Sequence, residues 1–209
     1  MTLWKSKYIY DATFQPLTAL QRIQLKSLCT AARRLDERHA IPATSSNFSL
    51  RCGPNHFFIS KSGLHKRDLE PNHFIRAHLN GTPIHLMSPK PSDETLLHSV
   101  VYRNNSKAGA VLHCHAPELE KLKSPQFIIN GHELLKALGK NSHTEPLSIP
   151  VIKNSQNMQK LALHVEKNIY NQGNNVIAFV LENHGIYCIG QNVEHAMASL
   201  EAILHLICI

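Results

Sequence analysis

The sequence is poor in cysteine and contains no long apolar run. Its five cysteines include no C-x-x-C pair and make no even-numbered framework, so we expect free thiols in a reducing compartment. The first residues lack the apolar core of a signal peptide, and the apolar segment 202–209 is too short to span a bilayer. We therefore expect a cytoplasmic protein without a membrane partner.

Clusters of basic residues are also missing. The formal net charge is +7, yet the lysines and arginines are scattered in ones and twos, with no run of five. No basic block is interleaved with aromatic residues, so we expect no nucleic-acid partner. A positive field also suits a small anionic substrate such as a phosphate ester, and we expect a partner of that kind.

The composition is otherwise that of an ordinary globular protein, with 43% hydrophobic and 18% charged residues over 209 positions. This length favours a single domain, 1–209, large enough to bury a core without cross-links. The apolar pattern predicts helices at both ends and mostly strands between them, which favours an α/β sandwich with a mixed sheet. Helices are expected at 17–38, after Ser92 or Asp93, and at 118–122, 132–138, 157–171 and 193–206; strands are expected at 47–51, 56–60, 74–79, 83–87, 108–117, 126–129, 147–152, 175–181 and 186–189.

Two histidines stand at the end of the strand expected at 108–117. His113 and His115 are two residues apart, and because side chains alternate along a strand, both imidazoles leave the same face while Cys114 points the other way. Two neutral imidazoles make the beginning of a divalent-metal site that needs a further ligand. The chain has 15 histidines, so a chance His-x-His pair is an open alternative.

A third histidine follows the apolar strand expected at 175–181. His184 precedes Gly185, where the backbone can turn and leave the imidazole exposed. If this strand end lies near His113 and His115, three imidazoles with an open position would form a catalytic rather than a structural zinc site. Alternatively, His184 is a turn residue whose ring is satisfied by backbone hydrogen bonds.

Five short motifs occur in an order that resembles the class II aldolase/adducin family: S-x-N-x-S at 45–49, S-G at 62–63, S-x-E at 92–94, H-x-H at 113–115 and H-G at 184–185. Within that family, ATSSNFSLR, KSGLHKRDL, PSDETLLH and GHELLKALGKNSHTEPLSIPVIKN resemble the methylthioribulose-1-phosphate dehydratases of methionine salvage. The resemblance covers nearly the whole chain. It implies a three-layer α/β/α sandwich with a largely antiparallel sheet, and a homotetramer with sites near the subunit boundaries.

The resemblance also implies a reaction and a set of site residues. It implies a lyase with one Zn²⁺ per subunit that converts 5-methylthioribulose 1-phosphate to 2,3-diketo-5-methylthiopentyl 1-phosphate and water. A cation that polarises the C2 carbonyl eases removal of the C3 proton, and the C4 hydroxyl can then leave if it is protonated. The implied metal ligands are His113, His115 and His184; the implied general acid/base is Glu133; the implied substrate-binding residues are Asn47, Ser62, Gly63, Ser92, Glu94 and Lys136.

Two departures from the family pattern and two other functions stay open. Ser46 stands where glycine commonly precedes the asparagine, so a positive φ there would be strained, and Lys61 replaces a common proline.

A sugar-phosphate aldolase or 4-epimerase would share the metal and phosphate sites. A non-catalytic, adducin-like scaffold would lose the ligands. Glu133 is alternatively an exposed carboxylate in a first helical turn.

Overall fold

The computed structural model describes residues 10–13, 15–122, 124–171 and 176–207. Its centre is one sheet of eight strands in the order β3-β2-β1-β4-β8-β7-β6-β5. Neighbouring strands are antiparallel except for β6 and β7, so the sheet is mixed and largely antiparallel, as expected. The strands are β1 (Asn47–Arg51), β2 (His56–Ser60), β3 (Phe74–His78), β4 (Ala110–Cys114), β5 (Gln126–Ile129), β6 (Leu147–Ile152), β7 (Ala178–Leu181) and β8 (Gly185–Gly190).

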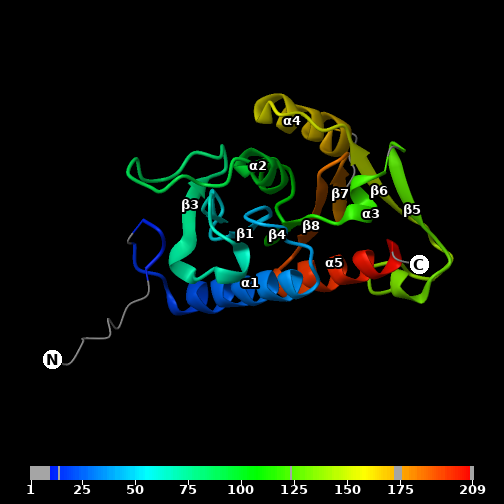
Figure 1. The fold of residues 1–209 in the computed structure, drawn as a ribbon, viewed down its shortest axis with the longest axis horizontal. Helices are drawn as coiled ribbons and strands as arrows, with labels where there is room; N and C mark the ends of the chain where they lie inside the picture. Colours follow the sequence, from blue (N-terminus) through cyan, green and yellow to red (C-terminus); the bar gives the residue numbers. More distant parts are fainter. Residues whose placement is uncertain (1–9, 14, 123, 172–175, 208–209) are drawn as a thin grey trace.

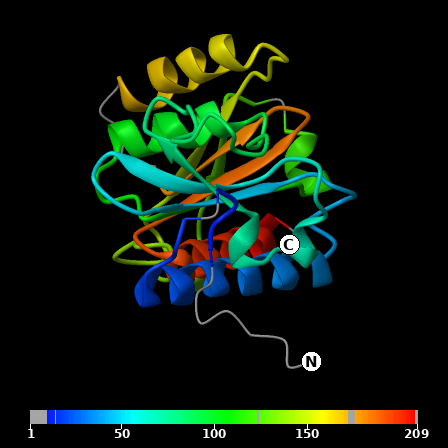
Figure 2. The same ribbon diagram turned by 90° about the vertical axis from the view of Figure 1, so that its left-hand side faces the viewer.

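Helices cover both faces of this sheet and give the expected three layers (Figures 1 and 2). One face carries α1 (Ala19–Glu37) and α5 (Val193–Ile207), and the other carries α2 (Thr95–Asn104) and α4 (Met158–Val165). Each helical layer packs on its own apolar core, and neighbouring residues of a strand enter opposite cores: Leu112 of β4 joins the α1/α5 side, whereas Val111 joins the α2/α4 side.

The first helix begins where the sequence supplies a cap. The Thr18 side chain accepts a hydrogen bond from the Gln21 backbone N–H, and the Gln21 side chain accepts one from the Thr18 N–H. This reciprocal pair satisfies two backbone donors at the helix start. A single-turn helix, α3 (Pro117–Glu120), follows β4. None of the helices among the described residues combines the length and apolarity needed to cross a bilayer.

The prediction of a strand at 83–87 is wrong. Pro83 forms only an isolated bridge to Ala77 of β3, because proline has no N–H to continue a ladder. Leu86 and Met87 are fully exposed, so the apolar pattern of this segment faces solvent and not a core. The chain runs as a loop at the edge of the sheet next to β3.

Three helices differ from the expectation in type or in their cap, whereas several other elements differ only at their ends. The helix expected at 132–138 is only a 3₁₀ turn, Glu133–Leu135, followed by Gly139 in a left-handed conformation with φ 81°. α2 begins at Thr95, with Glu94 as its N-cap and no side-chain capping bond, so neither Ser92 nor Asp93 caps it as expected. The helix expected at 157–171 is α4 followed by a π-helical segment, Glu166–Tyr170.

Candidate active site

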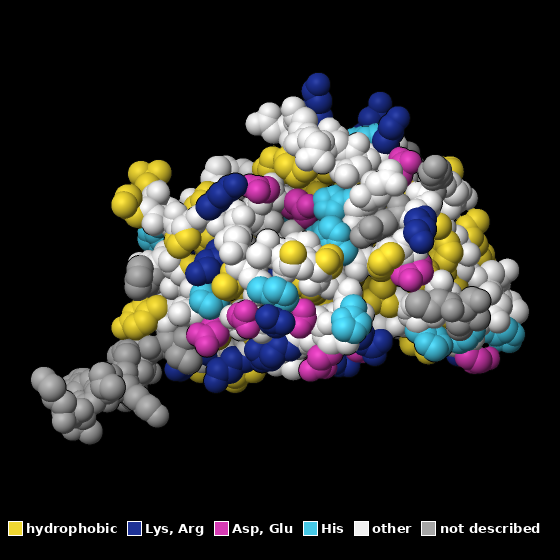
Figure 3. Space-filling model, viewed as in Figure 1, with side chains coloured by type: hydrophobic (Ala, Val, Ile, Leu, Met, Phe, Trp, Pro, Cys, Tyr) yellow, Lys and Arg dark blue, Asp and Glu magenta, His cyan; other side chains and the backbone are white. Residues whose placement is uncertain are grey.

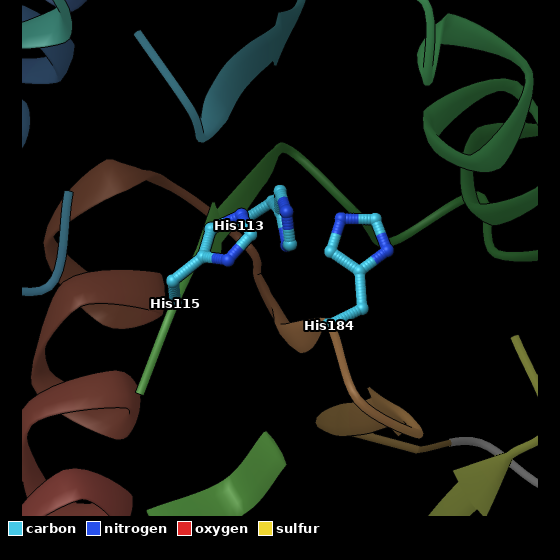
Figure 4. A group of neighbouring side chains, drawn as sticks. All are labelled: His113, His115 and His184. Carbon is cyan, nitrogen blue, oxygen red and sulfur yellow. The ribbon is translucent and has the colours of Figure 1, made fainter. Parts of the chain in front are cut away.

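Three histidines meet where two central strands lie side by side. β4 pairs antiparallel with β8, so the end of β4 lies beside the start of β8, with Cys114 opposite Ile186. His113 and His115 come from the end of β4, and His184 comes from the residue just before β8 (Figure 4). The ring centroids are 5.0 to 5.1 Å apart in all three pairs. The expected triad is therefore assembled within one chain.

The chemistry of His113 fits a metal ligand. Its Nδ1 lies 3.0 Å from the carbonyl oxygen of Ile186, which can only accept, so Nδ1 carries the proton and Nε2 presents a lone pair. Burial lowers the pKa of His113 to about 4, which keeps the ring neutral near pH 7. Nε2 is buried and makes no hydrogen bond to another described residue, although it faces the Glu94 carboxylate at 3.3 Å. A cation bound next to the His113 nitrogen and the Glu94 oxygen would offset the repulsion between these two electron-rich atoms.

The three rings together offer what a divalent cation requires. One ligand nitrogen from each of His113, His115 and His184 can be chosen so that all lie within 4.8 Å of one another. Three imidazoles leave at least one position open for substrate, which distinguishes catalytic from structural sites. Cys114 lies in the α1/α5 core, on the opposite side of the strand, and is not part of the cluster.

Glu94 occupies the space next to the imidazoles. Its Oε1 lies 2.8 Å from His184 Nε2, and its Oε2 accepts hydrogen bonds from Asn47 Nδ2 at 2.7 Å and from the Tyr187 hydroxyl at 2.5 Å. Burial alone would raise the pKa of Glu94, but the charge of His113 when that ring is protonated, and the hydrogen bonds from His184 and Tyr187, lower it below its usual range. Glu94 is therefore a fixed, ionised carboxylate beside the candidate metal centre.

A cavity of about 480 Å³ opens beside this carboxylate, which is ample for a small sugar phosphate. Figure 3 shows histidine side chains reaching the surface near the middle of this face, next to an acidic side chain. Five of the expected substrate-binding residues line the cavity with two of the histidines: Asn47, Ser62, Gly63, Ser92 and Glu94, together with His115 and His184.

The ends of two loops are tied together on one side of the cavity. The Ser62 N–H donates to the Lys90 carbonyl, and the Ser92 N–H donates to the Ser60 carbonyl, at 3.0 and 3.2 Å. These bonds hold Ser62 and Ser92 next to each other although thirty positions separate them. Gly63 follows with φ 75°, a left-handed conformation that glycine adopts without strain.

A second loop that lines the cavity presents two hydroxyl groups without a partner among the described residues. Ser45 and Ser46 line the cavity, and their buried Oγ atoms make no hydrogen bond to any described residue. Ser46 has φ 69°, so the expected strain at this position is present. Buried polar groups without a partner point to a ligand that bonds them when it binds.

Lys66 is a cavity residue that the sequence did not reveal. It is 2% exposed, and its Nζ donates to the carbonyls of Thr44 at 3.0 Å and Leu64 at 2.6 Å. Burial lowers its pKa, whereas Glu94 acts in the opposite direction. The ammonium thus joins the two loops beneath the cavity and adds a positive charge there. One lysine in SGLHKRDL carries no pattern that would separate it from a solvated charge.

Glu133 and Lys136 lie outside this cavity. They belong to the surface turn after β5, with side chains 69% and 53% exposed, and they pair with each other at 2.8 Å. His143 also lies 3.4 Å from Glu133. The hydrogen bond from Lys136 lowers the pKa of Glu133, opposite to the direction that a general acid needs. Within one chain, neither residue is brought to the histidines.

The chain is similar to curated proteins over most of its length. The chain is 39% identical over 183 residues to the methylthioribulose-1-phosphate dehydratase of Methylococcus capsulatus, covering 86% of this chain and 88% of the relative. It is 37% identical to the enzyme of the same name from Acidiphilium cryptum, covering 85% of each chain.

Solved structures give the same fold at lower identity. YgbL from Escherichia coli superposes with a TM-score of 0.76 at 19% identity, covering 90% of this chain and 88% of that one. The L-fuculose-1-phosphate aldolase of Thermus thermophilus gives 0.72 at 21% identity, covering 90% and 93%. The protein family described as "Class II Aldolase and Adducin N-terminal domain" matches residues 26–208 of this chain. The chain therefore belongs to the class II aldolase and adducin family.

Proposed function

We propose that this protein is a methylthioribulose-1-phosphate dehydratase. The observation that carries the proposal is the cluster of three imidazoles next to an ionised Glu94, in a cavity whose Ser45 and Ser46 hydroxyls have no partner in the described part of the chain. Relatives with 37 to 39% identity over most of the chain bear that name. The reaction removes the C3 proton and the C4 hydroxyl of the sugar phosphate as one molecule of water.

The cation that we propose for the three histidines is Zn²⁺, one per subunit, because three neutral imidazoles with an open position suit catalytic zinc. When bound, the ion supplies Lewis-acid polarisation of the ketose carbonyl. His113 is oriented for this purpose by its bond to the Ile186 carbonyl. Metal content of the purified protein, followed by removal and separate reloading with Zn²⁺, Mn²⁺ or Co²⁺, tests this choice.

The phosphate would bind at the other end of the cavity. Gly63 lies in a short loop that allows its backbone N–H to approach an anion, whereas Ser62 and Ser92, whose N–H groups already donate to carbonyls, would contribute their side-chain hydroxyls. Ser45 and Ser46, which line the same cavity, have hydroxyls without a hydrogen-bond partner among the described residues. With Lys66 beneath, this end combines hydrogen-bond donors with positive charge. The sugar carbons then extend from the phosphate towards Glu94 and the histidines.

Dehydration needs proton transfer, because the C3 proton must leave and the C4 hydroxyl must be protonated. We assign Glu133 as the general acid that protonates the leaving C4 hydroxyl, with Lys136 beside it. Because both side chains are exposed and away from the cavity of their own chain, they act in this proposal at the site of a neighbouring subunit. Burial there would raise the Glu133 pKa towards the range of a useful acid. A homotetramer with sites at subunit boundaries would provide that arrangement.

A mixing experiment tests this assignment. Glu133→Gln and His115→Ala chains carrying different tags are co-expressed, and mixed oligomers are purified through both tags. Each variant alone should be inactive, whereas random mixing should restore about one quarter of the sites, those that combine intact histidines with a neighbour's intact Glu133. Mixed oligomers without activity would remove Glu133 from catalysis in trans, and an active Glu133→Gln homomer would remove it from the mechanism.

A pair of substrates tests the reaction itself. Metal-loaded protein should consume methylthioribulose 1-phosphate with release of water and leave fuculose 1-phosphate uncleaved. Dehydration requires the C4 oxygen to be protonated, whereas retro-aldol cleavage requires it to be deprotonated. Cleavage of fuculose 1-phosphate without dehydration would replace the proposal with an aldolase.

Four described cysteines are free thiols, which suits the reducing cytoplasm that we propose as the location of this protein. Cys208 lies outside the described residues.

A further inference from the structure

Polar side chains line one face of α2 and the side of β1 that faces it, and their spacing along the helix matches their spacing along the strand. Glu94, His98 and Tyr102 are four residues apart, and Asn47 and Ser49 are two residues apart. Four helical residues rise about 6.0 Å and two strand residues about 6.6 Å, so two such stripes remain in register when helix and strand lie side by side. The side chains therefore alternate between the two elements along one buried line.

Hydrogen bonds connect these side chains from end to end. The Tyr102 hydroxyl lies 2.8 Å from Ser49 Oγ, and Ser49 Oγ lies 2.6 Å from His98 Nδ1. His98 Nε2 lies 2.5 Å from Asn47 Oδ1. Asn47 Nδ2 then donates to Glu94 Oε2 at 2.7 Å. The line ends on the carboxylate that faces His113 and His184.

The direction of every bond in this line follows from its end point. An ionised carboxylate only accepts, so Asn47 must present its NH₂ group to Glu94 and its Oδ1 to His98. His98 Nε2 must then carry the proton, which leaves Nδ1 as an acceptor. Ser49 therefore donates to His98, and Tyr102 donates to Ser49. One arrangement of protons satisfies all five groups.

His98 is the residue whose N–H keeps the Asn47 amide in this orientation. It is completely buried, and burial lowers its pKa to about 3, so the ring is neutral and holds a single N–H. The oxygen and the NH₂ group of an asparagine amide have nearly the same shape, so packing does not distinguish the two orientations. A hydrogen-bond donor on one side is needed to keep the oxygen on that side. If His98 did not donate, Asn47 could turn its carbonyl towards Glu94, and two acceptors would face each other.

We propose that His98 is a positioning residue that holds the Asn47 amide and, through it, the Glu94 carboxylate in place at the edge of the cavity. This role rests on the proposed function, in which Glu94 meets the substrate. His98 itself is fully buried and is not among the residues that line the cavity. At the other end of the line, Ser49 can donate to His98 Nδ1, which is compatible with the proton on Nε2.

Two substitutions of His98 separate positioning from general packing. His98→Gln places an amide near the former Nε2 and can still donate to Asn47, whereas His98→Asn reaches only the former Nδ1 and cannot. We expect His98→Asn to lower kcat by about 10- to 100-fold with metal content and KM nearly unchanged, and His98→Gln to recover most of that loss. Equal losses in both variants, or a loss of metal in His98→Asn, would overturn the proposal.

The proton position is measured independently of activity. Histidine labelled with ¹⁵N in the metal-loaded protein should show a neutral ring protonated at Nε2, assigned to His98 by its absence from the His98→Asn spectrum. A neutral ring protonated at Nδ1 would reverse the line of bonds and refute the role. If the protein proved not to dehydrate methylthioribulose 1-phosphate, the tautomer would still decide whether His98 directs Asn47.

Discussion

Gly185 packs directly against the backbone carbonyl oxygen of Cys114. A Cβ atom at Gly185 would lie 2.3 Å from that oxygen and 3.0 Å from Cε1 of His113. Gly185 does not have a positive φ; the left-handed residue of this connection is Asn183, with φ 54°. The glycine is thus required for the close approach of β4 and β8, and the expectation that the backbone turns at Gly185 is wrong. This contact brings His184 to the pair on β4.

Gly185→Ala should separate the two strands and disturb the histidine cluster. The backbone has to move because the clash is with a carbonyl and not with a flexible side chain. We expect a loss of about 1–3 kcal/mol in the free energy of unfolding, as for other overpacked interiors, together with weaker metal binding. Urea unfolding of the metal-free protein and competition with a chelator measure the two effects.

Gly53→Ala is the matched control for this substitution. Gly53 has no atom within 4 Å of its would-be Cβ and no positive φ. The free energy of unfolding should therefore change by less than about 0.5 kcal/mol, and metal affinity should stay the same. Equal behaviour of the two alanine variants would show that the Gly185 contact does not hold the site together.

Local sequence pattern predicted the parts of the site that lie on one strand. The alternation of side chains placed His113 and His115 together and Cys114 on the other side, and the structure confirms both. The distance to His184 could not be predicted from spacing, because it depends on which strand lies next to β4. That neighbour is β8, and only the order of the sheet decides it.

Features that depend on surroundings were not predicted. The apolar alternation at 83–87 resembled a strand, but a proline at the start and a solvent-facing edge prevented a ladder. Lys66 became a cavity residue because the carbonyl of Thr44, from a distant loop, and that of Leu64, from its own loop, both accept hydrogen bonds from its ammonium. The stripe from Glu94 to Tyr102 is visible as a four-residue spacing, yet its partner strand is more than forty residues away.

Lys66→Met should weaken substrate binding without removing the metal. The substitution keeps an unbranched buried side chain but deletes the positive charge beneath the phosphate end of the cavity. We expect KM for the sugar phosphate to rise by about tenfold, or roughly 1.4 kcal/mol, with kcat little changed. Inorganic phosphate should become a weaker inhibitor by a similar factor. Lys90→Met, which changes an exposed lysine paired with Asp93, is the control and should leave KM unaltered.

His115→Ala should remove the metal while the fold remains. His115 lies just beyond the end of β4, so its loss leaves the strand ladder and the buried His113 in place. Two remaining imidazoles bind a divalent cation far less tightly than three. Metal analysis after dialysis should find little bound ion, and activity should disappear with it. His164→Ala, on the exposed side of α4, should keep the full metal content. Retention of metal by His115→Ala would exclude this residue as a ligand.

The stability of the metal-free protein should fall on acidification because of His98. Burial lowers the pKa of His98 from 6.5 to about 3, so between these values the unfolded chain binds a proton that the folded chain refuses. Stability from this residue is therefore complete above about pH 6.5 and decreases as the pH falls towards 3, by up to about 1.4 kcal/mol per pH unit.

His98→Gln has no titrating group at this position, and the other histidines are common to both proteins. Between pH 6.0 and 4.5, urea unfolding should give a steeper decline for the wild type than for His98→Gln. The steeper slope requires a ring that stays neutral inside the fold. Parallel slopes would mean that the ring accepts a proton in the folded state, which a fully enclosed imidazole donating to Asn47 and accepting from Ser49 cannot do.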